Sequence, residues 1–133
     1  ASDVYKRQEE NTIADSIAVG VPRNPRKALR AVSASNGTWI AVSDEQILDA
    51  MRVLGRTEGV FGEPAGVTGA AGVKKLCEQG VLGENDTVVS VVTGNGLKDV
   101  ANAIKFCGEP MSLPNDLTLL VEEFDKRGIE TDA

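Results

Sequence analysis

The sequence predicts an α/β fold with three layers, in which a short parallel sheet is flanked by helices. The nearly continuous apolar run Val88–Val92 is typical of a strand that is buried on both faces of such a sheet. Short segments rich in β-forming residues also alternate along the chain with longer segments whose apolar residues recur at helical spacing. This alternation favours parallel strands that are joined by helices.

Composition and charge are those of an ordinary single domain. The chain has 133 residues, of which 41% are hydrophobic and 26% are charged. The net charge of -6 argues against nucleic acid and against an anionic membrane surface as partners, because both attract basic surfaces. No apolar stretch approaches the roughly 18 residues of a membrane span.

The chain contains two cysteines and no histidine. Without histidine, neither a histidine-based triad nor an imidazole metal site can be built, and we expect no metal site. Cys77 and Cys107 lie within helical patterns and lack metal-ligand spacing, so we expect free thiols that are buried or half-buried. Free thiols favour a reducing compartment, and we therefore expect a cytoplasmic protein.

The first eight residues, Ala1–Gln8, share no period with the sequence that follows. We interpret them as a non-native leader and exclude them from the fold, which leaves residues 9–133 as the folded part. A native, solvated leader is the alternative interpretation. From Thr12 to Gly20 the chain is apolar, but its pattern does not decide between helix and strand.

The first predicted helix begins at Asn24–Pro25, with the asparagine as cap and the proline at the first helical position, where its missing N–H does no harm. Asn36–Gly37 ends it. Its predicted buried stripe consists of Ala28, Leu29 and Val32.

Thr38–Val42 is rich in β-formers and short enough for a strand. The next four residues, Ser43–Gln46, have the spacing of a capping box and predict the start of a second helix. Apolar residues at helical spacing predict that this helix lies against the sheet: Ile47, Leu48, Met51 and Leu54.

The pair Val60–Phe61 is a candidate for a short strand before a third helix, which begins at Glu63–Pro64 and runs to about Gln79, with Gly80 as its stop. Three glycines follow at intervals of three within this helix, and each costs roughly 1 kcal/mol of helix propensity relative to alanine: Gly66, Gly69 and Gly72. Such a cost suggests that a backbone comes close. We favour close packing on the sheet or a helix over direct ligand contact.

The apolar run leads directly into the turn Thr93–Asp99. Ligands of open α/β sheets sit outside the carboxyl ends of the strands, so this turn is a candidate floor for a site. It is equally a tight connection in which Asp99 caps a helix that carries Val100, Ala103 and Ile104. A Gly-x-Gly-x-x-Gly dinucleotide loop is disfavoured, because Asp99 stands in place of the third glycine.

A last helix is predicted over Asp116–Arg127. Four apolar residues at helical spacing predict its buried face: Leu117, Leu120, Val121 and Phe124.

Four segments, taken in order, resemble the threonine synthases. They are Thr12–Asp15, Ala41–Glu45, Glu58–Gly66 and Thr93–Asp99, and the likeness runs from about residue 11 to residue 110. The Glu-Pro-Ala-Gly stretch is shared with threonine and serine dehydratases, whereas the Thr-Gly-Asn-Gly-Leu-Lys-Asp segment favours the synthases.

The resemblance implies a pyridoxal-phosphate enzyme of the tryptophan-synthase-β-like fold that converts O-phosphohomoserine and water to threonine and phosphate. It implies an amino-acid substrate and a homo-oligomer. In that family the Schiff-base lysine and the loop that binds the cofactor phosphate belong to the amino-terminal two-thirds. The resemblance therefore implies that residues 9–133 are the carboxy-terminal portion of the catalytic domain, with no catalytic residue of their own, and that this chain alone is inactive.

The resemblance also implies the cofactor-binding residues. The hydroxyl of Thr93 would hydrogen-bond the pyridine nitrogen, Gly94 would shape the turn, and a pocket wall would be formed by Glu63, Pro64, Ala65 and Gly66. A hydroxyl can donate to a neutral ring nitrogen, whereas a carboxylate would hold that nitrogen protonated. A neutral ring suits elimination and replacement at the β and γ carbons.

Two alternatives remain open at this point. The first is a fragment of a threonine or serine dehydratase, which shares the fold and the Glu63–Gly66 stretch. The second is a non-catalytic binding module derived from the same fold, which would need a closed core and protected sheet edges.

Overall fold

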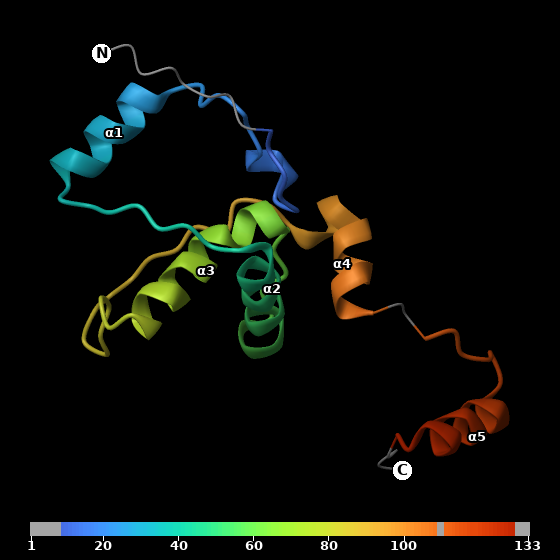
Figure 1. Cartoon of the computed structure of the whole chain (residues 1–133). Helices are drawn as coiled ribbons and strands as arrows, with labels where there is room; N and C mark the ends of the chain where they lie inside the picture. Colours follow the sequence, from blue (N-terminus) through green and yellow to red (C-terminus); the bar gives the residue numbers. More distant parts are fainter. Residues whose placement is uncertain (1–8, 109–110, 130–133) are drawn as a thin grey trace.

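The computed structural model of the protein describes residues 9–108 and 111–129. Helices α2 and α3 lie side by side at the centre of the molecule, and α1 and α5 stand away from them (Figure 1). The elements in chain order are η1 (Asp15–Ile17), α1 (Pro25–Ala34), α2 (Asp44–Glu58), α3 (Pro64–Glu78), η2 (Gly96–Asp99), α4 (Val100–Cys107) and α5 (Leu117–Arg127).

The predicted α/β fold with a parallel sheet is wrong. Over residues 9–108 and 111–129 the β-type pairing consists of one isolated antiparallel bridge, between Gly62 and Asn95. The two longer predicted strands, Thr38–Val42 and the apolar run with the residue before it, Thr87–Val92, are non-helical segments, and no backbone hydrogen bond joins one to the other; the short candidate Val60–Phe61 is not a strand either. A segment is a β-strand only when its backbone is hydrogen-bonded to a neighbouring strand, and these two segments are not hydrogen-bonded to each other.

The apolar run is also more exposed than predicted. Val89 is 86% exposed and Val91 is 71% exposed, whereas Val92 packs against the core. Helix α3 contacts this segment at Ser90, whose hydroxyl lies close to Gly69, while the side that carries Val89 and Val91 is open to solvent. The continuous apolar pattern predicted that both faces of this segment are buried. In the described residues only one face is covered, and Val89 and Val91 on the other face are exposed.

The predicted capping box at the start of α2 is confirmed. The Ser43 hydroxyl accepts a hydrogen bond from the Gln46 backbone N–H at 3.3 Å, and the Gln46 side chain accepts one from the Ser43 N–H at 2.9 Å. Gly59 ends the helix in the left-handed conformation, with φ of 65°. The helix packs against α3 instead of against a sheet.

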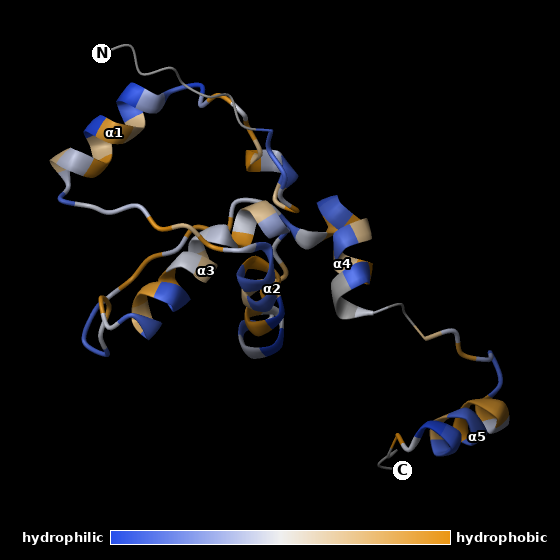
Figure 2. Ribbon diagram, viewed as in Figure 1, coloured by the Kyte–Doolittle hydropathy of each residue, from blue (hydrophilic) through white to orange (hydrophobic). Residues whose placement is uncertain are grey.

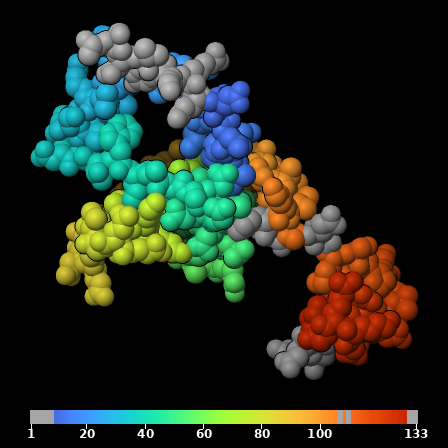
Figure 3. Space-filling view, in the orientation of Figure 1, coloured from blue at the N-terminus to red at the C-terminus, as the bar shows by residue number. Residues whose placement is uncertain are grey.

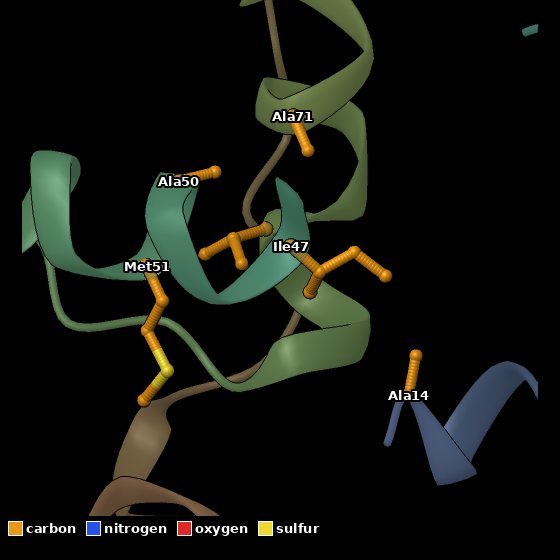
Figure 4. Close-up of a cluster of buried hydrophobic side chains, with 6 residues drawn as sticks. Ala14, Ile47, Ala50, Met51 and Ala71 are labelled. Atoms are coloured by element: carbon orange, nitrogen blue, oxygen red, sulfur yellow. The ribbon is translucent and has the colours of Figure 1, made fainter. Parts of the chain in front are cut away.

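The core lies between α2, α3 and the segment before η1 (Figure 4). Its buried apolar residues are Ala14, Ile47, Ala50, Met51, Val67 and Ala71. The Thr12 hydroxyl donates to Asp44 Oδ1 at 2.6 Å, and the Ile13 N–H donates to Asp44 Oδ2 at 3.3 Å. Asp44, the first residue of α2, thus fixes the segment that carries Ala14 into the core.

The glycines of α3 face neighbouring backbone and side chains, so the predicted close packing is confirmed, but its partners are non-helical segments and not a sheet or a helix. A Cβ on Gly66 would lie 2.8 Å from the carbonyl oxygen of Gly94, a Cβ on Gly69 would lie 3.1 Å from Ser90 Oγ, and one on Gly72 would lie 3.2 Å from Ile40 Cγ2. The helix packs on the two non-helical segments that were predicted as strands. Only small residues allow this approach.

Helices α1 and α5 were located correctly, but their predicted buried stripes are wrong. Neither helix has a buried residue. Leu29 of α1 is 55% exposed and Leu117 of α5 is 76% exposed. Figure 2 shows apolar residues on both helices, and Figure 3 shows α5 separate from the central body.

The predicted cap Asp99 is confirmed, and Asp116, predicted as the start of the last helix, is its N-cap. Asp99 Oδ1 accepts from the Asn102 N–H at 3.2 Å at the start of α4, and Asp116 Oδ1 accepts from the Thr118 and Leu119 N–H groups at the start of α5.

The remaining expectations have mixed outcomes. Cys77 is a free thiol but is exposed instead of buried, and the predicted leader lies outside the described residues, as does the side chain of Cys107. No helix among the described residues is long and apolar enough to cross a membrane. Those residues also contain no cluster of His, Cys, Asp and Glu side chains suited to a metal ion.

Candidate functional site

Two segments that are distant in sequence are joined where α3 begins. We call Phe61–Gly66 together with Thr93–Gly96 the junction. The Glu63 N–H donates to the Gly94 carbonyl at 3.0 Å, and the Gly96 N–H donates to the Phe61 carbonyl at 2.9 Å. These bonds flank the Gly62–Asn95 bridge, so the turn after the apolar run is fixed to the start of α3.

Glycines make the junction possible. A Cβ on Gly94 would overlap the Glu63 carboxylate, and a Cβ on Gly96 would lie 2.6 Å from the Phe61 ring. A Cβ on Gly62 would lie 2.5 Å from Val67 Cγ1 and 2.7 Å from Val92 Cγ1. Each of these positions therefore excludes any larger residue unless its neighbours move.

A cavity of about 370 Å³ opens on one side of the junction. It is lined by Gly59, Val60, Phe61, Val92, Thr93, Gly94 and Asn95. Its volume lies at the lower end of the range for small-molecule pockets, roughly 300–1,000 Å³. Its wall combines apolar side chains with the Thr93 hydroxyl, the Asn95 side chain and glycine backbone, and the polar part of the wall is the larger.

The structure places the predicted site residues in two groups. Thr93 and Gly94 line the cavity, and the Thr93 side chain is exposed. Glu63, Pro64, Ala65 and Gly66 do not line it but lie behind Gly94 at the start of α3, where Glu63, Pro64 and Gly66 are buried. The start of α3 and the Thr93 turn are therefore adjacent, as a shared pocket requires.

The sequence interpretation missed Phe61 and Asn95 as cavity residues and Lys98 as the ion-pair partner of Glu63. Lys98 Nζ lies 3.3 Å from Glu63 Oε1. The sequence did contain a signal for the two cavity residues. Gly62 follows Phe61 and Gly96 follows Asn95, and both pairs lie in segments that resemble the threonine synthases. Their spacing does not by itself indicate which side chains face each other.

The tight-turn interpretation of Thr93–Asp99 is also confirmed. The Asn95 side chain accepts from the Leu97 N–H at 2.9 Å and starts η2, and Asp99 then caps α4. The turn thus both connects to a helix and contributes to a cavity. The two interpretations are compatible.

A hydroxyl and close backbone beside a small, open cavity with both polar and apolar walls suit a small ligand that combines a flat ring with polar atoms. The chain belongs to the family of pyridoxal-phosphate-dependent enzymes, whose family model matches residues 1–94.

Among the curated proteins, several relatives that the chain matches are threonine synthases. The chain is 41% identical over 120 residues to a threonine synthase of Methanocaldococcus jannaschii, a match that covers 90% of this chain and 30% of the relative. It is 46% identical over 104 residues to the threonine synthase of Methanosarcina acetivorans and 43% identical over 110 residues to that of Halalkalibacterium halodurans. These matches cover 77% and 82% of this chain, and 26% and 31% of the relatives. The chain thus spans about a third of the length of the curated relatives it matches.

The cavity fits one end of pyridoxal phosphate. Phe61, Val60 and Val92 offer apolar contact to a flat ring, and the Thr93 hydroxyl can donate a hydrogen bond to a ring nitrogen. No lysine or arginine lines the cavity. Its residues therefore suit the ring-nitrogen end of the cofactor, and not the phosphate or the aldehyde.

Proposed function

We propose that the complete protein containing this chain is a threonine synthase, which uses pyridoxal phosphate to convert O-phosphohomoserine and water to threonine and phosphate. The observation that carries this proposal is the threonine-synthase likeness, 41% identity over 90% of the chain. The junction supports it, because two of the segments that carry the likeness meet there beside a cavity.

The role proposed for this chain is to hold the nitrogen side of the cofactor ring. Thr93 donates its hydroxyl hydrogen to the ring nitrogen, and Gly94 lets the turn approach the ring. Glu63, Pro64, Ala65 and Gly66 support Gly94 from behind as the wall of the pocket. When bound, the cofactor withdraws electrons from the substrate, and a hydroxyl partner leaves its ring nitrogen neutral.

We further propose that residues 9–133 form the carboxy-terminal portion of the catalytic domain. The Schiff-base lysine and the phosphate-binding loop are then supplied by the rest of the protein, and this chain contributes no catalytic residue. Phosphate release from O-phosphohomoserine by the purified chain tests this directly. Appreciable turnover would contradict it.

The test of the Thr93 assignment is Thr93→Val in the complete protein, with Thr93→Ser as the matched control. Valine keeps the shape but removes the donor, so we expect weaker pyridoxal-phosphate binding and slower turnover, while serine retains most of both. Cofactor titration by absorbance and assay of phosphate and threonine give the readouts. Equal cofactor affinity and rate in the valine variant would remove Thr93 from the site.

The same assay separates the synthase from a dehydratase. A dehydratase would form a 2-oxo acid from threonine or serine and release no phosphate from O-phosphohomoserine. We expect the opposite pattern.

The remaining parts of the proposal concern partners and location. We infer a small amino-acid substrate, a homo-oligomer, no nucleic-acid or membrane partner, and a place in the cytoplasm. The net charge of -6 supports the absence of anionic partners, and the free thiol of Cys77 supports a reducing compartment. Sedimentation of the complete protein measures its oligomeric state.

A further inference from the structure

The Glu63 carboxylate is buried, although it does not cap the helix that follows it. The residue is 5% exposed and occupies the N-cap of α3, yet its side chain makes no capping hydrogen bond. An ionised carboxylate is stable in such surroundings only when a cation or several donors compensate its charge. Its position therefore requires a partner.

That partner is Lys98, which reaches across the junction. Its Nζ lies 3.3 Å from Glu63 Oε1, and its side chain is 62% exposed while that of Glu63 is 7% exposed. Lys98 belongs to η2, which begins directly after the Thr93–Asn95 turn. The ammonium group thus approaches from the solvent side and compensates a carboxylate that lies inside.

The Glu63 side chain also occupies the space beside Gly94. A Cβ on Gly94 would overlap the carboxylate, so the carboxylate stands directly against the turn. The other two links across the junction are backbone hydrogen bonds, which do not depend on side-chain identity. Among the hydrogen-bonded and ionic links, the ion pair is therefore the one that a side-chain substitution can remove, while the packing of the Phe61 ring on Gly96 stays in place.

We propose that Lys98 is a positioning residue: by holding the Glu63 carboxylate against Gly94, it fixes the Thr93–Asn95 turn and so the place of the Thr93 hydroxyl. This inference rests on the proposed function, because the Thr93 hydroxyl matters only if it meets the cofactor ring. Lys98 itself does not line the cavity.

The experiment uses the complete protein with four variants: Lys98→Met, Lys98→Arg, the double variant Glu63→Gln with Lys98→Met, and Lys74→Met. Lys74 is the matched control, because it forms an ion pair with Asp49 on the surface, far along α3 from the junction. Pyridoxal-phosphate affinity and the fluorescence of the bound cofactor report on positioning. The unfolding temperature of the cofactor-free protein reports on structure.

We expect Lys98→Met to weaken pyridoxal-phosphate affinity by about tenfold or more and to lower the unfolding temperature, because it leaves a buried charge unpaired. Lys98→Arg should retain both, and Lys74→Met should leave the affinity unchanged and lower the unfolding temperature only slightly, through its exposed ion pair with Asp49. The double variant should recover the unfolding temperature, since no charge is left unpaired, but not the cofactor affinity or fluorescence, since the turn is no longer held.

Two results would overturn the inference alone. One is a wild type that binds pyridoxal phosphate while Lys98→Met matches Lys74→Met in affinity. The other is full recovery of cofactor affinity in the double variant, which would make the ion pair purely structural. A wild type that binds no pyridoxal phosphate would instead overturn the proposed function, and the positioning role with it.

Discussion

The α2–α3 pair and the outer helices α1 and α5 differ in what covers their apolar faces. Side chains of α2 and α3 bury one another, with Met51 1% exposed and Val67 fully buried. Neither α1 nor α5 has a buried residue, and Leu29, Leu117 and Leu119 face solvent, although both helices are well delimited at their ends. Local signals are thus enough to delimit a helix, whereas burial depends on a partner surface within reach.

The largest expected effect breaks the packed region. Met51→Ala in the chain should lower the free energy of unfolding by about 2–5 kcal/mol, because it removes a buried side chain and leaves a cavity. Leu119→Ala on α5 removes a side chain that is 51% exposed and should change it by no more than about 0.5 kcal/mol. Urea unfolding followed by circular dichroism measures both. Equal effects would show that α5 is packed in solution.

The next effect separates a glycine that is needed from one that is not. Gly66→Ala should destabilise the chain by about 1–3 kcal/mol, because its Cβ would meet the Gly94 backbone. Gly55→Ala on α2 meets nothing within 4 Å and should stabilise it by roughly 0.5–1 kcal/mol through helix propensity. The same unfolding measurement applies, and opposite signs are required of the two variants.

A smaller effect tests the local signal itself. Ser43→Ala removes the hydroxyl that caps α2 and should cost about 1 kcal/mol of unfolding free energy. Ser43→Asp keeps an acceptor at the N-cap and should retain most of the stability. An alanine variant as stable as the wild type would mean that packing on α3 alone starts the helix at Asp44.

The smallest effect concerns pH. The hydrogen bond from Lys74 lowers the pKa of Asp49 below 3.8, and the same bond raises the pKa of Lys74 above 10.5. The carboxylate contribution is therefore present above pH 3.8 and is lost as the pH falls through the lowered pKa. The ammonium contribution is present below pH 10.5 and is lost as the pH rises through the raised pKa. Asp49→Asn should slightly reduce the change in unfolding free energy with pH at the acidic and the basic end. An unchanged pH dependence would show that this ion pair does not contribute to stability.

Much of the helical structure was predictable because its signals are local. Asn24–Pro25, the Ser43 capping box, Gly80 and the aspartates at 99 and 116 each mark an end that the structure contains. The sheet prediction failed, because a strand forms only beside a hydrogen-bonded neighbour, and no local sequence pattern identifies that neighbour. Thr38–Val42 and Thr87–Val92 have strand composition, yet their close contacts are with the glycines of α3.

The candidate site divides in the same way. Thr93 and Gly94 were predicted from their place after the apolar run, and both line the cavity. Lys98 was missed because its partner, Glu63, lies 35 positions earlier in the chain. The Glu63 carboxylate pairs with Lys98 because it is buried, and its burial exists only in the folded molecule.

The exposed valines of Thr87–Val92 have a practical consequence for handling this chain. Six consecutive residues without charge or proline present β-forming side chains and open backbone to solvent, which is the composition of segments that stack into fibrils. Concentrated preparations should therefore precipitate with cross-β character, visible as a 4.7–4.8 Å fibre reflection. A lysine in place of Val89, the most outward of the valines, should delay this by charge repulsion.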